Sequence, residues 1–469
     1  MNDLVMELDS HSGRHLYEQI YDHIKREIRE GKLLYDEKLP STRLLAEYLQ
    51  VSRSTVDLAY EQLLSEGYIE SRPYRGFFVC KIEGLYDFQA QRAETAERET
   101  VVVPKYRYDF SPNGVELNSF PFRTWKKITK ETLTGDRKEM FALGHPQGDM
   151  ELRTTICRYL HASRGVNCSP EQIVIGAGND YLLLLLEKIL GRHRSVALEN
   201  PTYKRAYRIF ESFAYDVRTV PMDENGMCVD ALYECGADLA YVMPSHQFPT
   251  GIVMPIGRRM ELLKWASQKE QRYLIEDDYD SEFRYRGKPI PSLQASDREE
   301  KVIYIGTFSK AIAPAIRISY MVLPQRLLEC YRCQCMFFSS TVSRIDQSIL
   351  NVFIRDGAFE RHLNKMRKIY KSRHDALLGA CRTYFPGMEV SGENAGLHLL
   401  LHYKGNRTEK ELLEAAAGNG IKVYGMSETY IGRLPENWQP TLILGYAGLH
   451  ETEIEDGVRI LAGCIKHQP

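Results

Sequence analysis

YLIEDDYDSEF at residues 273–283 and VIYIGTFSKAIAPAIRISY at residues 302–320 decide the fold of most of this chain. Each stretch begins with an apolar run typical of a buried strand and continues with polar side chains. Similar β-rich runs at residues 172–175, 195–198 and 239–242 are separated by helix-length segments. This alternation predicts an open α/β sheet with helices on both faces, which binds ligands at the carboxyl ends of its strands.

The polar residues after these two strands have the chemistry that pyridoxal 5'-phosphate (PLP) requires. Lys310 supplies an amine that forms an imine, the internal aldimine, with an aldehyde. Asp277 is expected to keep the ring nitrogen of the cofactor protonated, and Tyr279 to hydrogen-bond the phenolic oxygen. Taken singly, a Ser-Lys pair is more often a surface feature and Asp-Asp-Tyr-Asp a solvated loop, so only their order and spacing carry the interpretation.

Three further side chains are expected to hold the phosphate of the cofactor: Thr307, Ser309 and Arg317. The segment 176–179 precedes a leucine-rich helix, and a helix N-terminus binds anions through its backbone N–H groups. The residues predicted to use it in this way are Ala177, Gly178 and Asn179. Tyr203 is predicted to stack on the cofactor ring.

Residues 14–82 predict a separate helical unit. Apolar residues recur at four-residue steps from Leu16 to Ile28, which indicates an amphipathic helix that ends at Gly31. Ser41 and Ser52 are placed to cap two further helices, the second of which closes at Gly67. Strand-like residues 68–71 and 77–79 around a turn then predict a hairpin. Three helices and a hairpin make a winged helix-turn-helix.

A recognition helix presents its first turn to base edges, and here that turn consists of short or basic hydrogen-bonding residues: Ser52, Arg53, Ser54 and Thr55. Together with Arg53, three arginines are expected to form phosphate and groove contacts: Arg43, Arg72 and Arg75. Residues 1–82 nevertheless carry 11 Lys and Arg against 14 Asp and Glu, a net charge of −3. The basic residues must therefore gather on one face, and Asp57 is expected to pair with Arg53. A general interaction module is the alternative.

The chain of 469 residues is long enough for several domains. We expect a DNA-binding domain at 1–82, a linker at 83–107 where Glu, Arg, Gln, Ala and Thr dominate, and an α/β domain at 108–469. The acidic N-terminus and the absence of a long apolar run argue against both a signal peptide and a membrane span. Ten cysteines without a dense framework favour a reduced, cytoplasmic protein. Cys330, Cys333 and Cys335 lack a fourth ligand, so no metal site is expected.

Residues 14–82 resemble the GntR-type winged helix in three segments: LYEQIYDHIKREIREGKL, LPSTRLLAEYLQVSRSTVDLAYEQLLSEGYIESR and RGFFV. Residues 108–469 resemble fold-type I, class I/II aminotransferases in seven: GHPQGDMELR, GAGNDYLLLL, ENPTY, MPSHQFPTG, EDDYDSEF, GTFSKAIAPAIR and LILGYAGL. This fusion resembles the MocR/GabR-type transcriptional regulators. The resemblance implies PLP as cofactor, a homodimer, and binding to two half-sites of a double-stranded DNA operator.

Two departures from the aminotransferase pattern concern the pocket. Phe248 stands where aminotransferases generally carry an Asn that bonds the cofactor ring oxygen. Ile443 stands where many carry an Arg that clamps the substrate carboxylate, a charge-assisted anchor. Arg205 is expected to replace that cation. His145 is expected to line an effector pocket, with a plain loop histidine as the alternative.

We therefore expect a PLP-dependent transcriptional regulator that senses a small amine, an amino acid or PLP itself. The effector amine would displace Lys310 from its imine and shift the DNA-binding equilibrium, with little or no repeated turnover. A working aminotransferase with a vestigial DNA-binding domain is the main alternative. A cofactor-free scaffold is a third, which the presence of both Lys310 and Asp277 disfavours.

Overall fold

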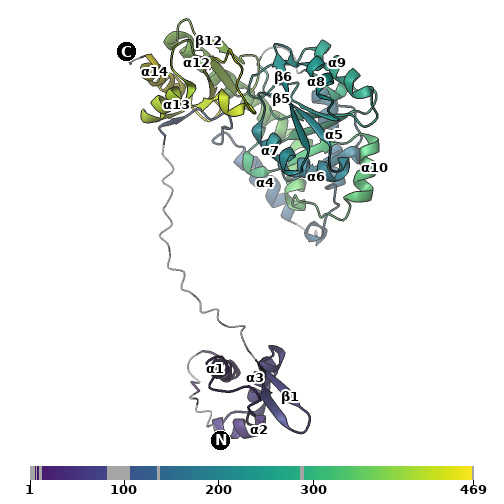
Figure 1. Ribbon diagram of the computed structural model, residues 1–469, viewed down its shortest axis with the longest axis vertical. Coiled ribbons are helices and arrows are strands. Elements are labelled where there is room, and N and C mark those ends of the chain that lie inside the picture. Colours follow the sequence, from purple (N-terminus) through teal and green to yellow (C-terminus); the bar gives the residue numbers. More distant parts are fainter. Residues whose placement is uncertain are drawn as a thin grey trace. The chain divides into compact units, whose positions relative to one another are not determined.

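The computed structural model describes residues 6, 8–9, 13–81, 106–134, 138–285 and 290–466. The chain divides into two compact units, Met1–Val103 and Pro104–Pro469, which we describe separately (Figure 1). The predicted linker, residues 83–107, lies outside the described residues except for Tyr106 and Arg107.

The described part of the first unit is a helical bundle with a hairpin. Its elements are α1 (Leu16–Arg29), α2 (Thr42–Leu49), α3 (Arg53–Ser65), β1 (Ile69–Arg72) and β2 (Gly76–Val79). The predicted caps are confirmed, since Leu44 N donates to Ser41 Oγ and Thr55 N donates to Ser52 Oγ, both at 3.2 Å. Each cap satisfies a backbone donor that the first helical turn leaves unpaired.

The core of the first unit lies between α1, α3 and the hairpin. Ile20 and Ile24 of α1 pack with Val56 of α3, and all three are fully buried. β1 and β2 pair antiparallel from Ile69 opposite Val79 to Arg72 opposite Gly76. This arrangement confirms the winged helix-turn-helix.

The second unit begins at β3 (Tyr108–Asp109) and alternates helices with strands. Its helices are α4 (Phe122–Leu133), α5 (Met150–Arg164), α6 (Asn179–Leu190), α7 (Lys204–Ser212), α8 (Val229–Cys235), α9 (Ile256–Ser267), α10 (Gln325–Gln334), α11 (Arg344–Arg355), α12 (Ala358–Tyr384), α13 (Glu409–Gly418) and α14 (Glu451–Lys466). Single-turn 3-10 helices are η1 (Lys138–Phe141), η2 (Pro170–Gln172), η3 (Gln294–Ser296), η4 (Pro314–Ile316) and η5 (Met426–Thr429).

Eight strands among the described residues form the large sheet, in the order β4-β11-β10-β9-β8-β5-β6-β7. Their bounds are β4 (Ile173–Gly176), β5 (Ser195–Asn200), β6 (Asp216–Asp223), β7 (Gly226–Met227), β8 (Leu239–Val242), β9 (Tyr273–Asp278), β10 (Val302–Thr307) and β11 (Ser319–Val322). The five strands from β10 to β6 are parallel, whereas β11 runs antiparallel to both of its neighbours.

Helices cover both faces of this sheet, as Figure 1 shows around β5 and β6. Leu198 of β5 packs into a core with α6 and α7, whereas its neighbour Ala197 packs with α8 and α9. Successive strand residues point to opposite faces, so both faces are buried and the strands are apolar throughout. The predicted open α/β sheet is confirmed.

The remaining strands are β12 (Glu389–Ser391), β13 (His398–His402), β14 (Ile421–Lys422), β15 (Tyr424–Gly425) and β16 (Thr441–Gly445). Within the described range, a second, antiparallel sheet has the order β12-β13-β16-β15, and β14 pairs with β3. Figure 1 shows this sheet in one lobe with α12, α13 and α14. No helix among the described residues has the length and apolarity to cross a membrane.

Candidate functional site

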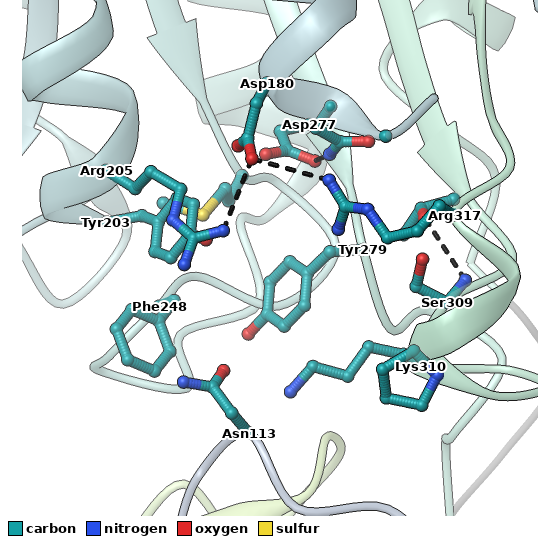
Figure 2. Close-up of a pocket in the computed structure, with 15 residues that line it drawn as sticks. Asn113, Asp180, Tyr203, Arg205, Phe248, Asp277, Tyr279, Ser309, Lys310 and Arg317 are labelled. Atoms are coloured by element: carbon teal, nitrogen blue, oxygen red, sulfur yellow. Dashed lines mark hydrogen bonds and ion pairs between the residues drawn. The ribbon is translucent and has the colours of Figure 1, made fainter. Parts of the chain in front are cut away.

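A pocket of about 290 Å³ lies beyond the carboxyl ends of β9 and β10 (Figure 2). Residues from six segments far apart in the sequence form its wall: Asn113, Gly178, Asn179, Asp180, Tyr203, Arg205, Met243, Phe248, Asp277, Tyr279, Thr307, Ser309, Lys310, Pro314 and Arg317. β9 and β10 pair in parallel with Asp277 opposite Ile305, which brings the polar residues that follow both strands to the same edge of the sheet.

Asp277 is a buried carboxylate at the end of β9. Tyr241 donates its hydroxyl to Oδ2, and Asn179 donates its amide to Oδ1 at 3.1 Å. Burial raises the pKa of Asp277 to about 7, because the charged form loses its hydration. A nearby cation would restore the charged form, and a protonated pyridine ring has the required chemistry.

Lys310 follows β10 and directs its amine into the pocket, toward Tyr279 and Asn113 in Figure 2. Its Nζ donates to the Pro112 carbonyl at 2.8 Å and lies 5.9 Å from the centre of the Tyr279 ring. Burial lowers the pKa of Lys310, which increases the share of neutral, nucleophilic amine at neutral pH.

Another part of the pocket wall collects groups whose chemistry suits an oxyanion. Gly178 precedes α6 with φ +97°, and a Cβ there would collide with the Arg317 guanidinium. Thr307 Oγ1 accepts from Ser309 N at 3.2 Å, whereas the buried Ser309 Oγ has no hydrogen-bond partner among the described residues. An unpartnered hydroxyl, a helix N-terminus and an arginine at one place fit a phosphate group.

Two predicted residues lie elsewhere. Ala177 is not part of the pocket wall, and its backbone N–H donates to Thr341 Oγ1 at 3.1 Å. His145 is exposed, is also absent from the wall of this pocket, and accepts a hydrogen bond from Gln147 N at 3.2 Å through Nδ1. This environment fits the alternative named in the sequence analysis, a plain loop histidine.

Aromatic rings form the side of the pocket next to Lys310. The Tyr203 and Phe248 rings meet edge to face with centres 6.1 Å apart, and Phe248 contacts the His398 ring in the same way at 5.5 Å. The Tyr279 hydroxyl lies 3.0 Å from His246 Nδ1. Phe248 thus presents an apolar surface where aminotransferases generally carry an amide.

Asn113 and Asp180 line the pocket without having been predicted to do so. Asp180 follows Asn179 on the first turn of α6, so the helix N-terminus that was predicted to bind phosphate could have indicated it. Asn113 lies in a loop after the two-residue strand β3, where no pattern in the sequence distinguishes it.

Ile443, at the position of the usual carboxylate-binding Arg, is not part of the pocket wall. It is buried in β16 and packs with Leu400 and Met426 in a small apolar cluster. An arginine at this position would therefore enter an apolar cluster.

In the winged helix-turn-helix, the predicted Arg53–Asp57 pair is confirmed, with Arg53 Nε 3.5 Å from Asp57 Oδ2. The Ser52 hydroxyl lies 2.8 Å from Ser54 Oγ and 2.7 Å from Thr55 Oγ1. These three hydroxyls therefore form a linked group at the exposed start of α3.

The wing arginines differ in their surroundings. Arg72 Nη2 lies 2.6 Å from both Asp36 and Glu70, so two carboxylates neutralise it within its own unit. Arg75 follows in the turn, with its guanidinium carbon 5.6 Å from the centre of the Phe78 ring. Arg43 is exposed on the first turn of α2.

Two family models match the chain, one in each of the two units of the structure. Bacterial regulatory proteins of the gntR family match residues 16–79, and aminotransferase class I and II matches residues 108–459. The chain belongs to the MocR/GabR-type transcriptional regulators. MocR/GabR-type membership makes this a DNA-binding regulator with an aminotransferase fold, and that fold implies dependence on PLP.

Relatives of this MocR/GabR-type chain match along nearly its whole length. The uncharacterized HTH-type transcriptional regulator YdeL of Bacillus subtilis (strain 168) is 40% identical over 96% of this chain and 97% of its own. The probable rhizopine catabolism regulatory protein MocR of Rhizobium meliloti is 30% identical over 97% of this chain and 94% of its own. A kynurenine aminotransferase structure from Pyrococcus horikoshii has a TM-score of 0.68 at 26% identity, over 78% of this chain and 91% of its own.

Proposed function

We propose that this regulator binds PLP in the pocket beyond β9 and β10, and that a small amine entering the same pocket controls operator binding. One observation carries the proposal. Lys310, the buried Asp277 and an oxyanion-binding end formed by Gly178 and Arg317 all line a single cavity of about 290 Å³. Bound there, PLP would supply an aldehyde that condenses with primary amines.

Each side chain has a distinct task in this proposal. Asp277, held in place by Tyr241 and Asn179, stabilises a proton on the ring nitrogen. Lys310 contributes the amine that faces the aldehyde, and Tyr279 the hydroxyl for the ring oxygen. The phosphate lies against residues at the other end: Gly178, Asn179, Thr307, Ser309 and Arg317. Tyr203 and Phe248 form the apolar wall.

Arg205 is the cation that we assign to the effector. It lies on the first turn of α7, lines the pocket and reaches Asp180 Oδ2 at 3.4 Å through Nη1. An anionic group on the effector would compete with Asp180 for this guanidinium. An amine without an anionic group would leave the pair in place.

Two copies of the chain are proposed to pair through the aminotransferase fold and to present two winged helices to a palindromic operator. Symmetric dimers match two-fold symmetric DNA sites, and the contact residues would come from the start of α3 and from the wing. The cytoplasmic location predicted from the cysteines stays a prediction.

The direct test is to purify the protein with PLP, reduce it with borohydride and locate the cofactor by peptide mass spectrometry. We expect label on Lys310 and an absorption band that reduction removes. Lys310→Ala should lack both, whereas Lys264→Ala, at an exposed position on α9, should keep them. A Lys310→Ala protein that carries the same reduced adduct would refute the assignment.

The working aminotransferase remains the competing function because Lys310 and Asp277 are both present in the pocket. Keto-acid production from a panel of amino acids and amines separates the two. We expect none beyond a single equivalent per chain. Sustained turnover at roughly 1 to 1000 per second would favour the enzyme instead.

A further inference from the structure

Among the described residues, three side chains that can ligate a metal lie close together: Cys157, His161 and Cys168. Their ligand atoms all lie within 4.8 Å of one another. Cys157 and His161 lie one helical turn apart on α5, and Cys168 lies in the segment between α5 and η2. Both thiols are buried, at 5% and 8% exposure, whereas His161 is exposed. None of the three lines the pocket described above.

Two of the distances between these atoms are close to those of a tetrahedral metal site. The two Sγ atoms are 3.9 Å apart, and Cys157 Sγ is 3.8 Å from His161 Nε2. Two thiolates each about 2.3 Å from a tetrahedral Zn²⁺ lie about 3.8 Å apart, and a thiolate and an imidazole nitrogen about 3.6 Å. These two distances need to change by only a few tenths of an ångström, whereas Cys168 Sγ and His161 Nε2, which lie within 4.8 Å of each other, need to approach by up to about 1.2 Å to hold the ion.

We propose that Cys157, His161 and Cys168 bind one thiophilic divalent cation, Zn²⁺, per chain. Binding forms two S–Zn bonds and one N–Zn bond, and the two thiols release their protons to solvent. Without metal, His161 Nε2 donates to the Cys168 carbonyl at 2.8 Å; metal binding through Nε2 breaks this hydrogen bond and leaves the ring proton on Nδ1. The exposed His161 side provides the entry path, and water takes the fourth position.

A disulfide is the alternative use of two buried thiols at this distance. The 3.9 Å between the sulfur atoms is almost twice the roughly 2.05 Å of a disulfide bond. A disulfide would also not involve His161, although its imidazole nitrogen lies from Cys157 Sγ at the distance expected of two ligands of one metal ion. The geometry thus favours the metal.

Zn²⁺ at this position would tie the last turns of α5 to the start of the segment that leads into the sheet. Ser169 directly follows Cys168 and caps η2, and η2 leads into β4, which ends at Gly176 beside the oxyanion-binding loop. The proposed ion therefore holds α5 against the α5–β4 connection, at a place distinct from the cofactor pocket.

The test uses the full-length protein, stripped with chelator under reducing conditions and titrated with Co²⁺ as a spectroscopic probe and with Zn²⁺ as competitor. We expect one Co²⁺ per chain, with a near-ultraviolet thiolate-to-metal band, and displacement by an equimolar amount of Zn²⁺. His161→Gln, at an exposed position, should weaken binding at least about tenfold, and Cys157→Ser should remove most of the thiolate band.

Cys381→Ser, which alters a buried cysteine on α12, is the matched control and should bind as the wild type does. The proposal is overturned if the reduced wild type takes up no stoichiometric Co²⁺ or Zn²⁺, or if His161→Gln and Cys157→Ser both bind as the wild type does. It is also overturned if mass spectrometry finds a Cys157–Cys168 disulfide and the reduced protein takes up no metal.

Discussion

Arg205 and Arg317 reach the same carboxylate oxygen, Oδ2 of Asp180, at 3.4 and 3.5 Å (Figure 2). One carboxylate therefore serves two guanidinium groups, and a net positive charge faces the pocket from α7 and from the residue after η4. All three side chains are about 40–60% exposed, so water screens the pairs and each contributes little to stability. Their arrangement matters for anion binding instead.

Arg205→Gln should abolish the spectral shift caused by an anionic amine effector and leave the resting PLP band intact. The reason is that Arg317, and not Arg205, is assigned to the phosphate. Absorption titrations with a panel of amino acids and amines measure both effects. Arg208→Gln, at an exposed position on the same helix, should titrate as the wild type does. Loss of the resting band in Arg205→Gln would instead place this residue at the cofactor.

Glu199 is expected to make the stability of the aminotransferase domain depend on pH. It is fully buried, and burial raises its pKa from 4.5 to about 8. The folded state thus keeps a proton that the unfolded chain has already lost, and the free energy of unfolding falls as pH rises from about 4.5 to about 8. Asp277, Glu276 and Glu282 act in the same direction, each with a pKa raised to about 7.

Glu199→Gln should therefore reduce the fall in the free energy of unfolding with rising pH in the cofactor-free protein. We expect the variant to be more stable than the wild type by roughly 1–3 kcal/mol at pH 8.5 and close to it at pH 5. Chemical denaturation across this pH range measures the difference, with the exposed Glu234→Gln as control. An equal pH dependence in the variant and the wild type would show that Glu199 does not carry this proton.

The wing arginines should differ in their effect on salt dependence. A plot of the logarithm of the DNA-binding constant against the logarithm of the salt concentration has a negative slope. Arg75→Ala should reduce the magnitude of this slope by about 0.9, as expected when one phosphate contact is lost. Arg72→Ala should change it less, because Asp36 and Glu70 already neutralise this side chain at 2.6 Å. Fluorescence anisotropy with an operator duplex selected by the wild type measures both slopes. A larger effect from Arg72 would contradict the role assigned to its ion pairs.

Ile443→Arg should not restore an aminotransferase. Position 443 is 2% exposed beside Leu400 and Met426, so the new guanidinium would be buried without a partner. A destabilisation of about 3–5 kcal/mol is expected, as for an uncompensated buried charge. Thermal unfolding of Ile443→Arg and of the volume-matched Ile443→Leu, together with keto-acid assays, tests this. Efficient turnover in a stable Ile443→Arg protein would show that the position reaches the pocket.

Local patterns in the sequence predicted much of the fold. Ser41 and Ser52 were recognisable as helix caps because a short hydroxyl before an apolar repeat has a specific backbone task. Asp277 and Lys310 were recognisable because each follows an apolar strand, and parallel strands end at a common edge. The antiparallel direction of β11 had no such signal, since a run of four buried residues has the same composition in either direction.

The parts of the site that escaped prediction depend on contacts between distant segments. Asn113 and Lys310 are far apart in the sequence, and only the folded chain brings the loop of Asn113 over the amine. The cluster of Cys157, His161 and Cys168 was missed for another reason: its residues are close in the sequence, but the third lies beyond the end of α5, where helical spacing gives no signal. The closer spacing of Cys330, Cys333 and Cys335 was the more visible pattern.

The lack of space for a side chain at Gly178 has a consequence for genetics. A methyl group at this position would meet the Arg317 guanidinium, at a backbone φ of +97° that L-residues rarely adopt. A Gly178→Ala allele would therefore remove signal reception while leaving residues 16–79 able to recognise DNA. In a cell that carries both alleles, mixed forms of the proposed dimer would occupy the operator without answering the effector. Such a dominant, signal-blind phenotype would reveal in a living cell which target genes require a responsive regulator.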